Sequence, residues 1–345
     1  MKTPRKTLFT DPKLVVVGNL DQEYIITPSG GVHNNLFGGD ALYAAAGAKM
    51  WMDGVCVLAK VGENFPTEWL GTANSFGIDT QGVVIDEKYI ESKRFYSYDT
   101  SLLPSTRNPA LGYLKAKKPF PKELLSMVQD RLGENRPYYD PTRAIRLVEI
   151  PKDYLSAKTL LLAGVDLPSQ LQLSSFFAHK LTSIIASSQN NHYMEHSHLD
   201  NLEKMFHGPS LFFTTEQQLR MLFWSHHVDV WHLAKMAVDL GCDIVTVDRG
   251  FKGSIILERV TQQKWTIPPY STKITDPTGM HAAFHGGATA GYYLTLDPVE
   301  AAIYGSVSSS ICADGTGPIY MLETLPDLAA NRLRNLRTKV KKTEA

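Results

Sequence analysis

The sequence predicts an α/β protein whose central sheet is mostly parallel and carries helices on both faces. Continuous apolar runs, such as residues 14–17 and 160–162, end in turn residues, which is typical of strands buried on both faces. Helix-length segments separate successive runs, and this alternation implies parallel strands joined by helices. Small residues dominate the stretch 282–291, as in a helix packed tightly against a sheet.

Length and composition bound the class of protein. With 345 residues and 43% hydrophobic content, the chain can bury one large core. Its 35 basic and 35 acidic residues balance, so neither nucleic acid nor a membrane is expected as the main partner. The three cysteines, Cys56, Cys242 and Cys312, are isolated, and there is no apolar run of about 18 residues and no signal-peptide core. We expect a cytoplasmic protein with buried thiols, one domain over residues 13–325, and tails at 1–12 and 332–345.

A glycine pair opens the first candidate functional stretch, residues 36–52. Gly38 and Gly39 allow the backbone to turn sharply and approach a ligand, and the alanine-rich residues that follow favour a closely packed helix. Asp40 lies at the start of this helix. It either faces the ligand or caps the helix.

Residues 273–294 form the second candidate stretch and the predicted centre of the chain. Asp276, Pro277, Thr278 and Gly279 have turn chemistry between a strand end and a helix. The first turn of such a helix directs unpaired N–H groups, and the positive end of its dipole, into the crevice above the sheet. The stretch therefore predicts an anion site.

Together these stretches resemble the signatures of the ribokinase and PfkB-type carbohydrate and nucleoside kinases. Asp276, Pro277, Thr278, Gly279 and Phe284 match the family pattern D-[PT]-T-G-A-G-D-x-F, and residues 36–52 resemble its G-G-x-x-x-N-x-A segment. The resemblance covers roughly residues 13–325. It implies a ribokinase-like fold with a small β-lid, ATP and Mg as cofactors, and a small-molecule ligand in the sheet crevice.

The tetrad that carries the chemistry departs from the family pattern. In the family, G-A-G-D cradles the transferring phosphate and its Asp is the general base, whereas here the tetrad is Gly279, Met280, His281 and Ala282. Ala282 thus marks the position of a lost base. His281 could still move a proton, but one step along a helix rotates a side chain by about 100°, which should point it away from the acceptor. The helix dipole is expected to keep His281 neutral.

The resemblance places five residues around the acceptor: Asp21, Gly38, Gly39, Asp40 and Tyr43. The family holds sugar hydroxyls with a carboxylate close to the Asp21 position, although a turn aspartate shows the same pattern. Tyr43 stands where the family has Asn, so it offers volume and one hydroxyl.

The nucleotide side also departs from the pattern. The segment resembling T-x-G-x-x-G keeps Gly250 and Gly253, with Lys252 between them, but Asp248 replaces the Thr. A negative charge would then lie beside a triphosphate. We predict weak or absent binding of ATP.

The magnesium network is weakened as well. Where the family has N-x-x-E, this chain offers Thr215 and Gln218 or, one residue earlier, Thr214 and Gln217, and a Gln cannot attract a magnesium–water cluster comparably. No other metal site is predicted. His192 and His196 have metal-ligand spacing, but we interpret them as solvated or capping residues.

The region between the two signatures contains the expected lid. Residues 82–99 alternate like strands, and a Pro-rich and Lys-rich insertion at 103–139, with a helix near 123–131, interrupts them. A homodimer through the lid is one expected assembly.

The departures are expected to face one crevice, while the scaffold glycines persist, and we interpret this pattern as repurposing of the pocket. The primary hypothesis is a pseudokinase that binds a small molecule, and a protein partner, with weak or no phosphorylation of a sugar or nucleoside. The alternative is an active small-molecule kinase with altered catalytic residues. A third hypothesis is non-kinase chemistry in the same pocket.

Overall fold

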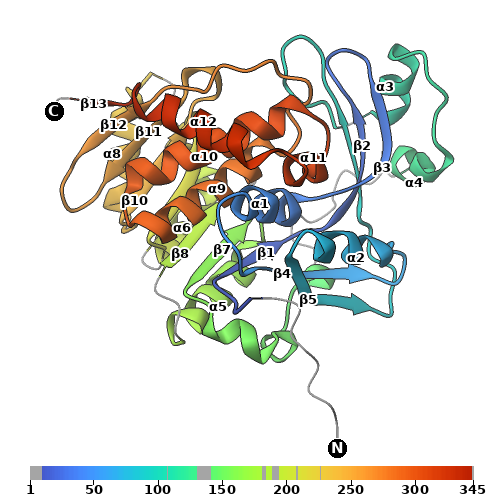
Figure 1. The fold of residues 1–345 in the computed structure, drawn as a ribbon, viewed down its shortest axis with the longest axis horizontal. Coiled ribbons are helices and arrows are strands. Elements are labelled where there is room, and N and C mark those ends of the chain that lie inside the picture. Colours follow the sequence, from blue (N-terminus) through green and yellow to red (C-terminus); the bar gives the residue numbers. More distant parts are fainter. Residues whose placement is uncertain are drawn as a thin grey trace, which may run out of the picture.

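The computed structural model describes residues 10–106, 108–129, 141–180, 184–188, 194–206, 209–225 and 227–343. Within these residues, a ten-stranded sheet has the order β13-β12-β11-β10-β9-β8-β7-β1-β4-β5, and a separate three-stranded sheet has the order β3-β2-β6 (Figure 1). Neighbours from β10 to β5 pair in parallel, and β11 to β13 add antiparallel strands at one edge. The predicted α/β fold class is confirmed.

The strands of the large sheet are short and mostly buried. Along the sheet they are β13 (Lys341–Thr343), β12 (Lys264–Ile267), β11 (Ser254–Glu258), β10 (Ile244–Asp248), β9 (Leu211–Thr215), β8 (Ile184–Ser188), β7 (Thr159–Ala163), β1 (Leu14–Gly18), β4 (Val55–Gly62) and β5 (Ile78–Asp86).

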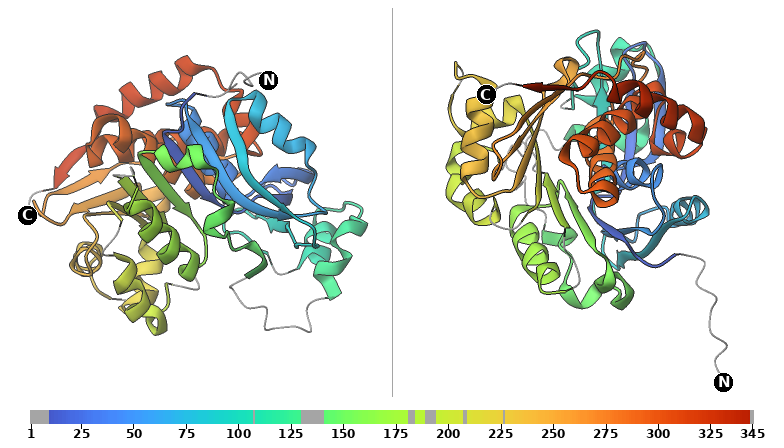
Figure 2. Two further views of the ribbon diagram at one scale, coloured as in Figure 1. Left: turned by 90° about the horizontal axis from the view of Figure 1, so that it is seen from below. Right: turned by 60° about the vertical axis from the view of Figure 1, so that its left-hand side comes forward.

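Helices cover both faces of this sheet because alternate side chains of each strand point to opposite faces (Figure 2). In β1, Leu14 and Val16 pack in the core beneath α1 (Asp40–Lys49), α9, α10, α11 and α12, whereas Val15 and Val17 pack toward α5. The other helices and helical turns are α2 (Glu68–Ser75), α3 (Pro109–Lys115), η1 (Lys122–Leu124), α4 (Leu125–Gln129), η3 (Pro141–Arg143), η4 (Leu147–Glu149), η5 (Lys152–Ser156), α5 (Leu167–Ala178), η6 (His196–His198), α6 (Leu199–Phe206), α7 (Glu216–Leu222), α8 (Val230–Asp239), η7 (Gly250–Lys252), α9 (Met280–Thr295), α10 (Pro298–Asp314), α11 (Pro318–Leu322) and α12 (Pro326–Arg337).

Helices α1 and α9 pack unusually closely. A Cβ atom at Gly286 would lie 1.8 Å from the carbonyl oxygen of Ala44, and one at Gly47 would lie 2.3 Å from that of Ala283. Glycine at these positions lets the two backbones touch. The contact brings the first turns of both helices to the same side of the sheet.

The lid differs from its predicted composition. It consists of β2 (Asp21–Ile26), β3 (Val32–Gly38) and β6 (Lys93–Ser97), whereas β5 lies at the edge of the large sheet. Of the range predicted for the lid, only the part after β5 therefore contributes. The sequence does not predict β2 because the strand begins with three polar residues, which are nevertheless buried: Asp21, Gln22 and Glu23.

The expected C-terminal tail is mostly ordered structure. Arg332 and Leu336 of α12 are buried, Arg332 pairs with Asp314 at 2.5 Å, and β13 pairs with β12. The prediction of a tail from residue 332 is therefore wrong as far as residue 343. The sequence of α12 is basic, like that of a solvated tail, and sequence alone does not reveal that one of its arginines is buried against a carboxylate.

Other sequence predictions have clear outcomes. The helix expected near 123–131 is present as α4, although residues 130–139 of the insertion lie outside the described residues. All three cysteines are buried, as predicted. Over the described part of the chain, none of the helices has the length and apolar character needed to cross a bilayer.

Candidate ligand pocket above the sheet

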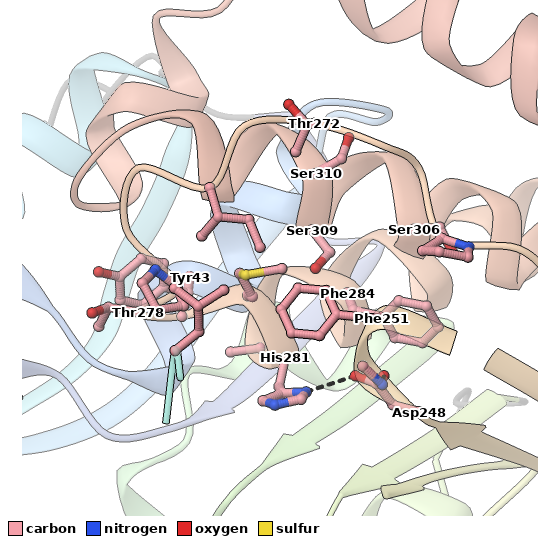
Figure 3. Close-up of a pocket in the computed structure, with 18 of the residues that line it drawn as sticks. Tyr43, Asp248, Phe251, Thr272, Thr278, His281, Phe284, Ser306, Ser309 and Ser310 are labelled. Carbon is pink, nitrogen blue, oxygen red and sulfur yellow. Dashed lines mark hydrogen bonds and ion pairs between the residues drawn. The ribbon is translucent and has the colours of Figure 1, made fainter. Parts of the chain in front are cut away.

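A cavity of about 600 Å³ lies where β10 ends, between the lid and the first turns of α1 and α9 (Figure 3). Open α/β sheets bind ligands at this edge. Its wall includes Asp40 and Tyr43 from α1, Asp248 at the end of β10, and Gly250 and Gly253 beside η7. The predicted positions 279–282 all contribute to it as well.

The turn before α9 is held by a buried carboxylate. Asp276 is fully buried, and its Oδ1 accepts hydrogen bonds from the Thr278 N–H at 2.9 Å and the Thr278 hydroxyl at 2.7 Å. Gly279 then adopts φ +78°, and a Cβ atom there would lie 2.2 Å from the ring of Tyr43. Only glycine fits this position, because both the backbone and the adjacent ring exclude a side chain.

Ala282, the predicted position of the lost base, lies in the cavity wall. Its methyl group forms part of the cavity wall and is 5% exposed. A methyl group cannot accept a proton, so this position of α9 offers no general base. Met280, two residues earlier, fills part of the same wall.

His281 does not meet the expectation of a neutral imidazole. Its Nδ1 lies 2.7 Å from Oδ2 of Asp248, and this carboxylate raises the pKa of His281. Burial opposes ionisation of Asp248, but His281 and the Gly250 N–H together hold its pKa below the ordinary value. A carboxylate in direct contact outweighs the dipole of α9. The two side chains therefore form an imidazolium–carboxylate ion pair at pH values above the lowered pKa of Asp248 and below the raised pKa of His281.

Glu23 of the lid is a site residue that the sequence did not reveal. Its carboxyl group is 1% exposed, accepts hydrogen bonds from the Gly39 N–H and the Tyr43 hydroxyl, both at 3.0 Å, and forms part of the cavity wall. Burial raises its pKa to about 8. A Cβ atom at Gly38 would lie 2.2 Å from this carboxyl, so the glycine pair makes room for Glu23. A charged residue inside a strand was the only signal available.

Asp40 faces the cavity and does not cap α1. Gly39 is the N-cap, the cap has no side-chain hydrogen bond, and a Cβ atom at Gly164 would lie 2.8 Å from the Asp40 carboxylate. Solvent reaches this carboxylate through the cavity. Even so, partial desolvation by the surrounding protein, followed by repulsion from the charge of Asp21, raises its pKa to about 6.

Asp21 does not line the cavity. It is buried, its Oδ1 lies 2.9 Å from Nη2 of Arg143, and its Oδ2 lies 3.8 Å from Nε of Arg94. Gly38 and Gly39 lie behind Glu23, and Lys252 is exposed on η7, so these three residues also do not line the cavity.

Gln218 does not face the crevice, contrary to expectation. It belongs to the capping box of α7, in which its N–H donates to the Thr215 hydroxyl at 3.1 Å and its Oε1 accepts from the Thr215 N–H at 3.0 Å. A Thr and a Gln three residues apart satisfy a helix N-terminus in this way.

The residues present do not fit a magnesium–triphosphate group. Among the described residues, the cavity wall contains no lysine or arginine, and no group of three or more His, Cys, Asp or Glu side chains could hold a metal ion. His196 contacts the Leu222 carbonyl oxygen at 2.9 Å and stacks on Trp224. His192 lies outside the described residues.

Comparisons with known proteins agree with this architecture. Residues 126–325 match the model of the pfkB family of carbohydrate kinases. A cytidine kinase from Thermococcus kodakarensis is 26% identical over 281 residues, which are 81% of this chain and 88% of that kinase.

Solved structures show the same fold. A nucleoside kinase from Methanocaldococcus jannaschii superposes with a TM-score of 0.64 at 17% identity, covering 95% of this chain and 99% of that one. A putative ribokinase II from E. coli, solved with ATP and Mg, superposes with a TM-score of 0.68 at 12% identity, covering 94% of this chain and 99% of that one.

Proposed function

The chain belongs to the pfkB family of carbohydrate kinases, and on that premise we propose that it binds a nucleoside-like or sugar-like small molecule with weak or no ATP-dependent phosphorylation. The observation that carries the proposal is Ala282. It lines the cavity in the first turn of α9, where the sequence pattern of the family has an aspartate base. Loss of a general base costs ~10²–10⁴-fold in rate.

The nucleotide side of the cavity supports the same proposal. Phosphoryl transfer depends on positive groups that neutralise the phosphates. Here the only cationic side chain in the described wall is His281, and it is paired with Asp248. Binding of a triphosphate would require breaking that pair and placing the phosphates beside a carboxylate.

The acceptor side supports retention of a ligand. The volume of about 600 Å³ is in the range of small-molecule sites, and aromatic rings from the lid and α1, namely Tyr43, Tyr96 and Tyr98, surround it. The cytidine and nucleoside kinases among the similar proteins make a nucleoside the first class of ligand to examine.

An active kinase is the second candidate, and Asp40 is the observation that favours it. This carboxylate faces the same cavity as Ala282 and has a pKa of about 6, which suits a general base near neutral pH.

Three measurements test the proposal. Thermal shifts of the purified chain with adenosine, cytidine, ribose and fructose should identify at least one ligand. Calorimetry with ATP and Mg should show no micromolar affinity, and turnover of ATP with the bound ligands should stay at background. Micromolar ATP affinity together with turnover that Asp40→Asn abolishes would establish the second candidate instead.

A further inference from the structure

We infer that the cavity selects ligands that carry a protonated amine, such as aminonucleosides, and that Asp40 is the residue that binds this amine. The inference rests on the proposed function, because it names the chemical class of the ligand for the same cavity. It follows from the charges around the cavity and from the position of one carboxylate.

Asp248, Asp21 and Glu23, which lie in or behind the cavity wall near Asp40, already have partners. Asp248 is paired with His281 at 2.7 Å. Asp21 contacts two arginines away from the cavity wall. Glu23 accepts hydrogen bonds from the Gly39 N–H and the Tyr43 hydroxyl, and its raised pKa of about 8 keeps it protonated at neutral pH.

Asp40 lies in the cavity wall and lacks such a partner. It makes no hydrogen bond or ion pair with any side chain in the described ranges, although it lies in the cavity wall and is open to solvent. The closest cations act on it only through space, because Arg94 contacts Asp21 and His281 contacts Asp248. An unpaired carboxylate beside a cavity favours a ligand that brings its own positive charge.

The position of Asp40 is fixed by its surroundings. It is the first residue of α1, where the helix dipole favours a negative charge. Its carboxylate lies against the backbone of Gly164, at the end of β7, where a side chain would collide with it. The carboxylate is thus held in place toward the cavity.

The rest of the wall suits an organic cation better than an anion. Tyr96 and Tyr98 are half-buried aromatic residues in this wall, and aromatic rings attract ammonium groups and stack with heterocycles. A phosphate group would face Asp40 and Asp248 without a free lysine or arginine in the described wall. Neutral nucleosides can stack on the rings but offer Asp40 only uncharged hydroxyl donors.

Matched ligands test this inference at pH 7. The set comprises 5′-amino-5′-deoxyadenosine, 3′-amino-3′-deoxyadenosine, adenosine and adenosine 5′-monophosphate, together with the corresponding cytidine compounds. We expect at least one aminonucleoside to bind at least ~10-fold more tightly than its parent nucleoside, as a charge-assisted hydrogen bond would provide, and the monophosphates to bind more weakly than the parents.

Two variants assign the effect to Asp40. Asp40→Asn should remove the preference for the amine, so that each aminonucleoside and its parent nucleoside bind to this variant with similar affinity. Asp239→Asn, which removes an exposed carboxylate on α8 outside the cavity wall, should leave the preference unchanged. Equal or tighter binding of the parent nucleosides, or an amine preference that persists in Asp40→Asn, would overturn the inference and leave the proposed function intact. If none of these compounds, nor any sugar, binds at millimolar concentration, the proposed function itself is contradicted.

Discussion

Nδ1 of His281 lies 2.7 Å from Oδ2 of Asp248, and this contact joins the first turn of α9 to the end of β10 across the wall of the cavity. Both residues stand where the family pattern has Gly and Thr. The two departures are therefore one structural feature, because each residue supplies the partner of the other.

The pair should titrate in a defined pH window. His281 has a raised pKa, so its contribution is present below its ordinary value of 6.5 and is lost as pH rises through the higher folded value. Asp248 has a lowered pKa, so its contribution is present above 3.8 and is lost at lower pH. Titration by NMR, with the imidazole signal assigned through His281→Gln, should give a pKa above 6.5. Asp248→Asn should lower that value more than Asp40→Asn does, because Asp40 raises it less.

Absence of any difference between Asp248→Asn and the natural chain would contradict the ion pair. The effect on the free energy of unfolding is expected to be under ~1 kcal/mol, because the His281 side chain is 64% exposed.

The buried carboxyl group of Glu23 predicts a loss of stability as pH rises. Its pKa is about 8 in the folded chain against an ordinary value of 4.5, so the folded state holds the proton more tightly and loses stability as pH rises between these values. Glu23→Gln cannot ionise and should therefore have a higher melting temperature than the natural chain, with a difference that grows from pH 5 to pH 8. Each pKa unit corresponds to about 1.4 kcal/mol, so the full effect is at most several kcal/mol.

A control separates this effect from a general change in charge. Glu63→Gln removes an exposed carboxylate and should leave the difference independent of pH. A Glu23→Gln variant that loses stability equally at every pH would instead show that the carboxyl group is needed for packing.

The contact between α1 and α9 predicts a strong dependence on glycine. Gly286→Ala would place a methyl group 1.8 Å from the carbonyl oxygen of Ala44, so the helices must separate. We expect a loss of roughly 1–3 kcal/mol, although alanine favours the helix by about 1 kcal/mol. Gly71→Ala in α2 meets nothing within 4 Å and should be neutral or stabilising. Equal melting temperatures for the two variants would contradict the close packing.

Much of the scaffold could be predicted because it depends on local patterns. The apolar runs of β1 and β7, the many small residues of helices α1 and α9, and the Asp297 cap of α10 each give a local physical signal. The turn at residues 276–279 likewise has the conformation that its residues favour.

The site could be predicted only in part, because its decisive contacts join distant segments. His281 and Asp248 are 33 residues apart in the sequence, and neither local sequence pattern predicts a contact with the other residue. Glu23 lies in strand β2, which is difficult to predict from sequence because its first three residues are polar. The family resemblance implies a place in a metal network for Gln218, whereas a local capping box accounts for this residue.

Restoring the base provides the most direct test of the lost activity. The Ala282 methyl group lines the cavity, so an aspartate at this position would enter it, but Met280 and the His281–Asp248 pair would still occupy the wall beside it. Ala282→Asp alone is therefore expected to create little activity. The combination of Ala282→Asp, Met280→Ala and His281→Gly should raise ATP turnover with a bound sugar or nucleoside above that of the natural chain.

A matched triple variant with Ala282→Asn has the same volume without a base, and turnover should differ between the two by ~10²–10⁴-fold. Equal turnover in the two triple variants would contradict the role assigned to this position, and loss of a measurable natural activity in His281→Ala would show that the chain is a working kinase.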